Sequence, residues 1–386
     1  MSATIILPRI LQVGRNACEA VASVMSQLGC SRPLIITDPM MVQLGYVTRV
    51  QAVLEEAGLR SSVFADTVPE PTVTSIDAGV VAARADDFDC LLALGGGSPI
   101  DSAKAIAILA RHGGTMRDYK FPRNVSEAGL PVIAIPTTAG TGSEMTRFTI
   151  ITDDTVDEKM LCVGMGFLPV AALVDYTLSI SAPPRITADT GIDALTHAIE
   201  AYVSRKANAY SDSQALAAMG LLGPNLRRVF HDGRDEPARE AMMMGATLAG
   251  AAFSAASVAL VHGMSRPIGA HFHVPHGLSN AMLLPCVTEF SIASAAERYA
   301  NCARAMGIAA PGENVLIANR KLLQELRDLN TELQVPTPAG FGIEQDAYFA
   351  KLELMAEQAL ASGSPGNNPR VPTIDEMISI YQSIWC

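Results

Sequence analysis

Asp193 and His197 lie four residues apart in a stretch with a helical pattern, so both side chains leave the same face of the predicted helix about one turn apart. Further along the chain, His262 and His276 are fourteen residues apart. One carboxylate and three imidazoles form a mixed oxygen and nitrogen set that suits Fe(II) or Zn(II). Such a set leaves positions open for a substrate oxygen, which is the arrangement of a catalytic metal site.

The neighbouring histidines leave the ligand set open at this point. His271 and His273 lie in the same segment as His276, and periodicity does not choose among them. An aspartate and a histidine at helical spacing also form an ordinary solvated contact on many helices. The residues alone therefore predict a metal site without fixing its ligands, and a structural role is the alternative.

A run of 25 residues, 241–265, contains no Asp, Glu, Lys or Arg and is long enough to span a bilayer. It consists mostly of Ala, Gly, Ser and Met and includes His262. This composition favours a buried helix that packs closely against its neighbours over a membrane span. We expect His262 to end that helix in a buried position, as a hydrogen-bonded core residue or as a metal ligand.

A glycine turn precedes one of the predicted helices. In CLLALGGGSPIDSAKAIAILAR (90–111), an apolar strand, three glycines and a helix follow one another. The glycines permit positive φ and a close ligand approach, Ser98 is placed to cap the helix, and the unpaired N–H groups at the helix start suit a diphosphate. Neither the Rossmann fingerprint nor the P-loop pattern occurs here, so an ordinary tight turn is the alternative.

A second polar loop strengthens the case for a nucleotide. PTTAGTGSE (136–144) follows the apolar strand PVIAI and offers hydroxyl groups. The carboxyl ends of parallel strands lie at one edge of a sheet, where open α/β sheets bind ligands. Two such loops after successive strands predict a nucleotide site at that edge.

The order of the predicted elements indicates two domains. Helical patterns and short apolar strands alternate at first, as in βαβ units around a parallel sheet that is covered on both faces. After SAPPR (181–185) the strand patterns cease, and long Ala-, Leu- and Met-rich helices follow. We predict an α/β domain over residues 1–182 and an all-helical domain over 183–386, because the two prolines interrupt any helix between them.

Composition narrows the function classes. The 386 residues are 49% hydrophobic and 17% charged, which provides enough apolar material for two cores. A formal net charge of −11 without a basic run argues against nucleic acid as a partner. Seven scattered cysteines without a CxxC pair, and an N-terminus without the pattern of a secretion signal, predict a cytoplasmic protein.

The motifs together resemble those of a known family. GGGSPIDSAK, PTTAGTGSEMT, TGIDALTHAIEAYVS and HGMSRPIGAHFHVPHGLSNAMLLP are similar to the successive signatures of the iron-containing (group III) alcohol dehydrogenases, and the similarity extends to NNPR (367–370). The resemblance implies a dehydroquinate synthase-like architecture: an α/β dinucleotide-binding domain with a parallel sheet, then an all-α metal-binding domain. It also implies a homodimer or a larger homo-oligomer.

The resemblance assigns roles to individual residues. It selects His276 over His271 and His273 as a ligand, so that the implied metal ligands are Asp193, His197, His262 and His276. Phe148 and Phe253 match positions that face substrate or nicotinamide. The implied cofactor contacts are Asp38, Gly95, Gly96, Gly97, Ser98, Asp101, Thr137, Thr138, Thr141, Ser143, Lys159 and Leu178.

Asp38 bears on the choice of cofactor. It ends the predicted strand LIITD, where a carboxylate accepts hydrogen bonds from a ribose 2′-hydroxyl but repels a 2′-phosphate. The sequence therefore predicts NAD(H) rather than NADP(H). An exposed turn aspartate before Pro39 is the alternative.

The chain departs from the family pattern at two positions. Ala259 stands where a glycine is common, and Arg266 replaces a histidine that is usually assigned to proton relay or to the pocket lining. Arg266 follows His262 by one helical turn, and its guanidinium matches carboxylate, sulfonate or phosphonate groups but is a poor proton carrier. We expect a substrate with an anionic group and a proton path through water, a cofactor hydroxyl or His271. The alternative is that Arg266 turns away and pairs with a surface or interdomain carboxylate.

The implied reaction is reversible hydride transfer between a small alcohol, or its aldehyde or ketone, and NAD, with Fe²⁺ or Zn²⁺ polarising the substrate oxygen. The alternatives are a zinc-dependent polyol enzyme similar to glycerol dehydrogenase, a reductase of an acidic aldehyde such as a semialdehyde, a metal-free maleylacetate reductase, and a non-catalytic nucleotide-binding protein. The complete ligand set and the intact loops favour the metal-dependent dehydrogenase.

Overall fold

The computed structural model describes residues 3–156 and 158–386. These fall into two compact units, Ile6–Ser181 and a unit that contains Ala182–Cys386. All seven cysteines are free thiols. Each unit has its own elements and its own candidate site, so the two are described separately.

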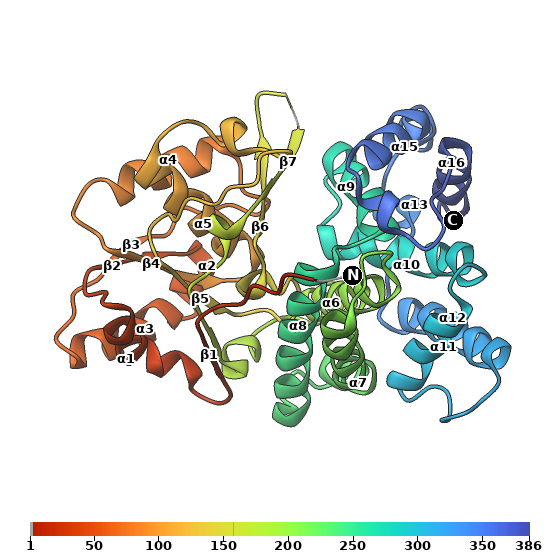
Figure 1. Cartoon of the computed structure of the whole chain (residues 1–386), viewed down its shortest axis with the longest axis horizontal. Coiled ribbons are helices and arrows are strands. Elements are labelled where there is room, and N and C mark those ends of the chain that lie inside the picture. Colours follow the sequence, from red (N-terminus) through yellow and green to blue (C-terminus); the bar gives the residue numbers. More distant parts are fainter. Residues whose placement is uncertain (1–2, 157) are drawn as a thin grey trace. The chain divides into compact units, whose positions relative to one another are not determined.

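The first unit is built on a six-stranded sheet in the order β1-β8-β5-β4-β2-β3, and every pairing in it is parallel (Figure 1). This order agrees with the alternation predicted from the sequence. The strands are β1 (Ile10–Val13), β2 (Pro33–Ile36), β3 (Ser62–Phe64), β4 (Cys90–Gly95), β5 (Val132–Pro136) and β8 (Ala171–Val174). A separate antiparallel pair consists of β6 (Phe148–Asp153) and β7 (Glu158–Val163).

Helices cover both faces of this sheet, and each face has its own apolar core. Successive residues of a strand point to opposite faces. Leu34 and Ile36 therefore pack with α4 and α5, whereas Ile35 packs with α1 and α3. The helices are α1 (Val21–Leu28), α2 (Pro39–Gln43), α3 (Tyr46–Glu56), α4 (Val73–Ala83) and α5 (Gly97–His112). Short 3-10 turns are η1 (Ala17–Ala20), η2 (Met116–Tyr119), η3 (Ser143–Met145), η4 (Met165–Phe167) and η5 (Tyr176–Ser179).

The second unit is helical over its described residues, as the sequence predicts. Its elements are α6 (Pro184–Val203), α7 (Ala209–His231), α8 (Glu236–Ala256), α9 (Leu260–Phe272), α10 (His276–Ile292), α11 (Ala296–Ala305), α12 (Val315–Glu332), α13 (Pro338–Phe341), α14 (Gln345–Phe349), α15 (Leu352–Ala361), η6 (Ser364–Asn367) and α16 (Ile374–Ser383).

The uncharged run at 241–265 is buried as expected, but it is not one helix. The chain bends by 103° between α8 and α9, and no single helix among the described residues is long and apolar enough to cross a membrane; only this bent pair passes a test of length and composition. Ser257, with φ of 67°, ends α8. The prediction that His262 ends the uncharged helix is therefore wrong: His262 lies in the first turn of α9.

Candidate functional site

α6 carries three acidic or basic side chains on one buried face. Asp193, His197 and Glu200 are separated by four and three residues, which places them in one row along the helix. All three side chains are at most 6% exposed. A helix surface that buries a carboxylate, an imidazole and a second carboxylate needs partners for each of them.

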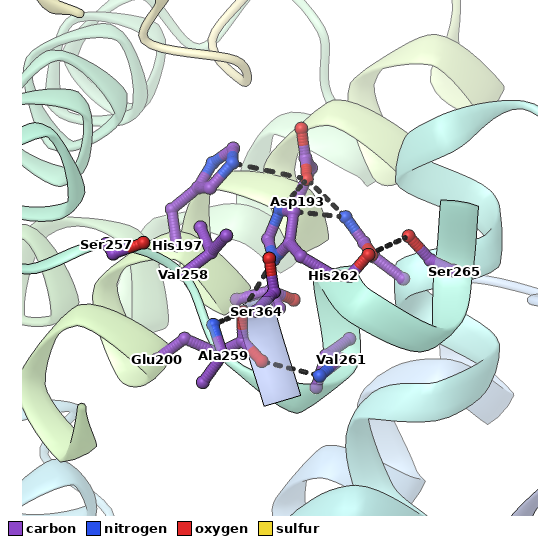
Figure 2. A network of polar contacts seen from close by, with 12 residues as sticks. Asp193, His197, Glu200, Ser257, Val258, Ala259, Val261, His262, Ser265 and Ser364 are labelled. Carbon is purple, nitrogen blue, oxygen red and sulfur yellow. Dashed lines mark hydrogen bonds and ion pairs between the residues drawn. The ribbon is translucent and has the colours of Figure 1, made fainter. Parts of the chain in front are cut away.

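The candidate metal site gathers around Asp193. Its Oδ1 atom lies 3.8 Å from Nε2 of His197, 3.5 Å from Nε2 of His262 and 3.8 Å from Nε2 of His276. One donor atom from each of the four residues lies within 4.8 Å of the others. Figure 2 shows His197 and His262 directed toward Asp193 from two helices. One oxygen and three nitrogens around a common centre can hold a divalent cation.

His276 reaches the site because α10 begins close to α6. A Cβ atom placed on Gly277 would lie 2.4 Å from the backbone oxygen of Asp189, so the approach of the two helices requires a glycine here. His276 is the first residue of α10, and its side chain is 33% exposed, in contrast to the other three candidate ligands. Access from outside the protein is therefore on the His276 side of the ligand set.

Glu200 joins α6 to the start of α9. Its carboxylate accepts hydrogen bonds from the backbone N–H groups of Ala259 (2.9 Å) and Val261 (2.6 Å), two groups at the N-terminus of α9 that have no partner within their own helix (Figure 2). Its Oε2 atom also lies 2.7 Å from Nδ1 of His262. Because a carboxylate only accepts, Nδ1 of His262 carries the proton and Nε2 keeps its lone pair for a metal.

The electrostatics of this cluster favour a cation. Burial alone would lower the pKa of His262, but the carboxylates of Glu200 and Asp193 raise it to about 9. Burial alone would raise the pKa of Asp193, but the three surrounding imidazoles hold it well below its usual range. The cluster therefore attracts positive charge, which a proton on His262 supplies when no metal is bound. A metal cation would displace that proton, since the imidazoles bind metal in their neutral form, and would balance the two buried carboxylates.

Phe253 of α8 stacks on His197, with ring centroids 4.2 Å apart and an interplanar angle of 16°. The ring of His262 also stacks on the ring of His197, with ring centroids 4.5 Å apart. These contacts fix the plane of His197. Phe253 therefore lies directly against the ligand set, where the resemblance placed a residue that faces substrate or nicotinamide.

His271 and His273 lie outside the cluster. His271 donates from Nε2 to Oε1 of Gln358 at 2.9 Å, and His273 is exposed with φ of 54° at the end of α9. The structure thus brings together the four residues that the motifs selected and leaves the two competing histidines apart.

Arg266 is one turn beyond His262 on α9 and donates from Nη1 to Oγ of Ser364 at 3.1 Å. Among the described residues, its buried Nε atom has no hydrogen-bond partner and its guanidinium forms no ion pair within 4 Å. Burial lowers the pKa of Arg266, and the charge of Glu200 opposes this shift. The alternative prediction, an ion pair with a surface or interdomain carboxylate, is not found among the described residues.

In the first unit, the two predicted loops meet at the carboxyl ends of β4 and β5, which are neighbours in the sheet. A Cβ atom on Gly97 would lie 2.7 Å from Cγ2 of Thr141, and one on Gly96 would lie 3.2 Å from Oγ1 of Thr138. The glycines therefore allow close packing of the loops. Of the three glycines at 95–97, only Gly95 has a positive φ (149°). Conformational freedom is therefore not the reason for glycine at positions 96 and 97.

Ser98 does not cap α5, contrary to our expectation. The helix begins at Gly97 with Gly96 as N-cap, which puts Ser98 inside the first turn, where its Oγ accepts from the backbone N–H of Glu70 at 3.3 Å. The start of α5 still directs its first N–H groups toward the sheet edge. A diphosphate at this place, as the motif predicts, would therefore be held by backbone N–H groups rather than beside a serine cap.

Lys104 is a buried cation beneath these loops. Its Nζ atom donates to Oγ of Ser143 (2.7 Å), to Oγ1 of Thr146 (3.1 Å) and to the backbone oxygen of Phe148 (2.7 Å). Ser143 in turn donates to Oδ1 of Asp101 at 2.6 Å. Burial lowers the pKa of Lys104 to about 8, although Asp101 and Glu144 oppose this shift.

The remaining predicted cofactor residues lie at separate places in the first unit and have different partners. Asp38 follows β2 and is the N-cap of α2, where Oδ1 accepts from the backbone N–H of Met41 at 3.0 Å. Lys159 pairs with Glu70 at 2.8 Å. Leu178 is 1% exposed within a sheet core. Thr137 is buried at the end of β5 beside the same loops.

Sequence reasoning missed three residues that the structure places at these sites: Glu200, Asn280 and Lys104. Each had a signal. Glu200 continues the row of Asp193 and His197, Asn280 lies one turn after His276, and Lys104 is a cation within the Ala- and Ile-rich run AKAIAILA.

Comparisons with known proteins bear on both units. Residues 8–176 match the model "Iron-containing alcohol dehydrogenase", and residues 187–385 match "Fe-containing alcohol dehydrogenase family, C-terminal". The chain is 40% identical over 349 residues to long-chain-alcohol dehydrogenase 1 of Geobacillus thermodenitrificans, covering 89% of this chain and 88% of that protein.

Solved structures agree with these matches. 1,3-Propanediol oxidoreductase is 33% identical, with a TM-score of 0.95 and complete coverage of both chains. Sulfoacetaldehyde reductase from Bifidobacterium kashiwanohense in complex with NAD⁺ is 27% identical, with a TM-score of 0.89, and covers 100% of this chain and 99% of that one.

The pKa of Lys104 yields a test of its burial. The unfolded chain keeps the lysine proton to about pH 10.5, whereas the folded chain loses it near pH 8, so between these values the unfolded state binds more protons and this group makes stability rise with pH. The gain is at most about 3 kcal/mol. We expect the rise in the free energy of unfolding, measured by urea denaturation from pH 7.5 to 10.5, to be smaller in Lys104→Met than in wild type. Lys321→Met, which removes an exposed lysine, serves as the control. Parallel pH curves for wild type and Lys104→Met would show that Lys104 is not titrating in this range.

Proposed function

Because the chain belongs to the iron-containing alcohol dehydrogenase family, we propose that it interconverts a small alcohol and its aldehyde or ketone by hydride exchange with NAD(H) at the metal site described above. The convergence of Asp193, His197, His262 and His276 is the observation that carries this proposal. The physiological substrate would be set by side chains around this site.

The residues present fit a divalent metal. The donors are one carboxylate oxygen and three imidazole nitrogens, their surroundings are negatively charged, and Glu200 holds His262 in the tautomer that offers Nε2. A metal bound there supplies Lewis acidity to the substrate oxygen, which stabilises the alcohol as alkoxide or polarises the carbonyl. The set accepts Fe²⁺ or Zn²⁺, and family membership favours Fe²⁺.

The first unit is proposed to hold the cofactor, so that residues 1–182 serve as the dinucleotide-binding domain and 183–386 as the metal and substrate domain. Three features support this: the backbone cradle at Gly96 and Gly97, the hydroxyl groups of Thr138 and Thr141 beside it, and Asp38 at the end of the neighbouring strand β2. The nicotinamide carries the hydride, and the protein's part is to orient it.

The edge of the sheet supports a homo-oligomer. β1 is the terminal strand of the sheet, and it exposes Leu11 and Val13 by 40% and 41%. An exposed apolar edge strand is a surface that proteins cover, often with a second copy. We propose that this edge contributes to self-association.

Arg266 supports a second candidate function, reduction of an aldehyde with an anionic group. A partly buried guanidinium without a contacting counter-ion among the described residues is costly, and a bound carboxylate, sulfonate or phosphonate would offset that cost. One structural relative is a sulfoacetaldehyde reductase, whose named substrate carries a sulfonate. The alternative is that Arg266 balances the charge of Glu200, with no contact to substrate.

The ligand assignment predicts unequal metal loss from two neighbouring histidines. We expect His276→Ala to lose most of its bound iron on gel filtration, since one of four donors is removed, while His273→Ala keeps it. Metal content by elemental analysis decides between them. Equal iron loss from both variants, or iron loss from neither, would show that the assignment of His276 as a metal ligand is wrong.

The role of Asp38 predicts a shift in cofactor preference. Asp38→Asn keeps the cap of α2, because asparagine caps helices as well as aspartate does, but removes the charge. We expect the ratio of kcat/KM for NAD(H) to that for NADP(H) to fall by about tenfold, the effect of one lost charge-assisted interaction. An unchanged ratio would mean that Asp38 acts only as a cap.

The acidic-aldehyde hypothesis is tested by comparing succinic semialdehyde with an uncharged aldehyde of similar length. We expect wild type to prefer the acidic aldehyde in kcat/KM by about 10- to 100-fold and Arg266→His to lose that preference. Arg304→His is the control, since Nε of Arg304 is buried in the same manner. No preference in wild type, or a preference that survives the substitution, would leave an uncharged alcohol as the substrate.

A further inference from the structure

Asn280 lies at the centre of the candidate metal site, although neither the resemblance nor the comparisons assign it a role. It is fully buried on α10, one turn after His276. Its amide Nδ2 donates to Oδ1 of Asp193 at 2.7 Å. The same nitrogen lies 3.1 Å from Nε2 of His262 and 3.2 Å from Nε2 of His276.

The three contacts involve atoms that the metal would use. An amide has two N–H groups, so it can serve Asp193 and one imidazole at a time. The lone pairs of the imidazoles point at the metal when it is bound, whereas a carboxylate oxygen has lone pairs enough to bind metal and accept a hydrogen bond together. The bond to Asp193 is thus the one that is compatible with a bound metal.

The donor also determines which face of the ligand set is covered. The amide nitrogen lies within 3.2 Å of one donor atom each of Asp193, His262 and His276. It therefore covers the face that those three residues form. A substrate oxygen then has to approach on a face that includes His197, the residue on which Phe253 stacks.

We propose that Asn280 is a positioning residue of the metal site: it holds Oδ1 of Asp193 toward the imidazoles and keeps the face formed by Asp193, His262 and His276 closed to solvent. This inference rests on the proposed function, because it assigns a role toward the metal of that site. Asn280 would limit the number of open coordination positions at the metal, which the proposed function leaves unspecified.

Metal affinity and the spectrum of bound Co²⁺ test the proposal on the full-length protein. Co²⁺ is the probe, with affinity measured against a chelator and the visible absorption bands recorded after loading. We expect Asn280→Ala to bind Co²⁺ about 10- to 100-fold more weakly, the usual effect of removing a group that orients a ligand. We also expect weaker visible bands, because water entering the uncovered face raises the coordination number.

A second variant separates the donor role from the covering role. Asn280→Leu has a branched shape similar to that of asparagine but cannot donate a hydrogen bond and adds no charge. We expect it to weaken Co²⁺ binding as Asn280→Ala does, while its visible bands stay close to those of wild type because the face remains covered. If Asn280→Leu binds Co²⁺ as tightly as wild type, the donor role is overturned.

Asn319→Ala is the matched control. Asn319 is another buried asparagine with one donated bond, to the backbone oxygen of Ala296 at 2.9 Å, and with an Oδ1 that, like that of Asn280, has no partner among the described residues. If Asn280→Ala changes affinity and spectrum no more than Asn319→Ala, the proposal is wrong. If wild type itself fails to bind Co²⁺ at a ratio near one per chain, the proposed function fails first, which distinguishes the two.

Discussion

The carboxylate of Glu200 is the interaction on which the candidate metal site depends. Three N–H groups converge on it, two from the first turn of α9 and one from the imidazole of His262. A buried carboxylate is stable only with such partners, and the start of α9 is stable only with an acceptor. Glu200 and the start of α9 therefore satisfy each other's hydrogen bonds. These bonds fix both the position of α9 relative to α6 and the tautomer of His262.

The break between α8 and α9 exists for the same reason. In a continuous helix through 241–265, the backbone N–H of residue 259 would donate within the helix and could not donate to Glu200. Asn367 holds the break from the other side, donating to the backbone oxygen of Val258 at 2.9 Å. Ala259, which replaces a glycine common in the family, has φ of −128° and is tolerated, because the positive φ of this segment lies at Ser257. Lys104 has a comparable role in the first unit, where one buried charge on α5 holds the segment 143–148.

The sequence predicts the fold well where periodicity and burial agree. The strands of the parallel sheet, the helical second half and the four converging metal-site residues all follow from local patterns and ordered motifs. It fails where the decisive partner is distant in the chain. No residue type near 257 predicts the end of α8, because the carboxylate that accepts from Ala259 after the break belongs to Glu200, 59 residues earlier in the chain. Likewise Ser98 has the residue type of a cap, but α5 begins at Gly97, which packs closely against the distant Thr141.

The substrate is encoded separately from this framework. Proteins named for a long-chain alcohol, for 1,3-propanediol and for sulfoacetaldehyde share most of this chain's length and, for the two with solved structures, its fold. The framework that binds a metal cannot therefore by itself distinguish their substrates. Selectivity therefore has to come from side chains other than the four candidate ligands, and Arg266 is the residue proposed above for that role. Its helix is held by Glu200, and its guanidinium donates to the neutral hydroxyl of Ser364. Under that proposal, exchanging the guanidinium for a neutral side chain changes the charge offered to the substrate without moving the helix.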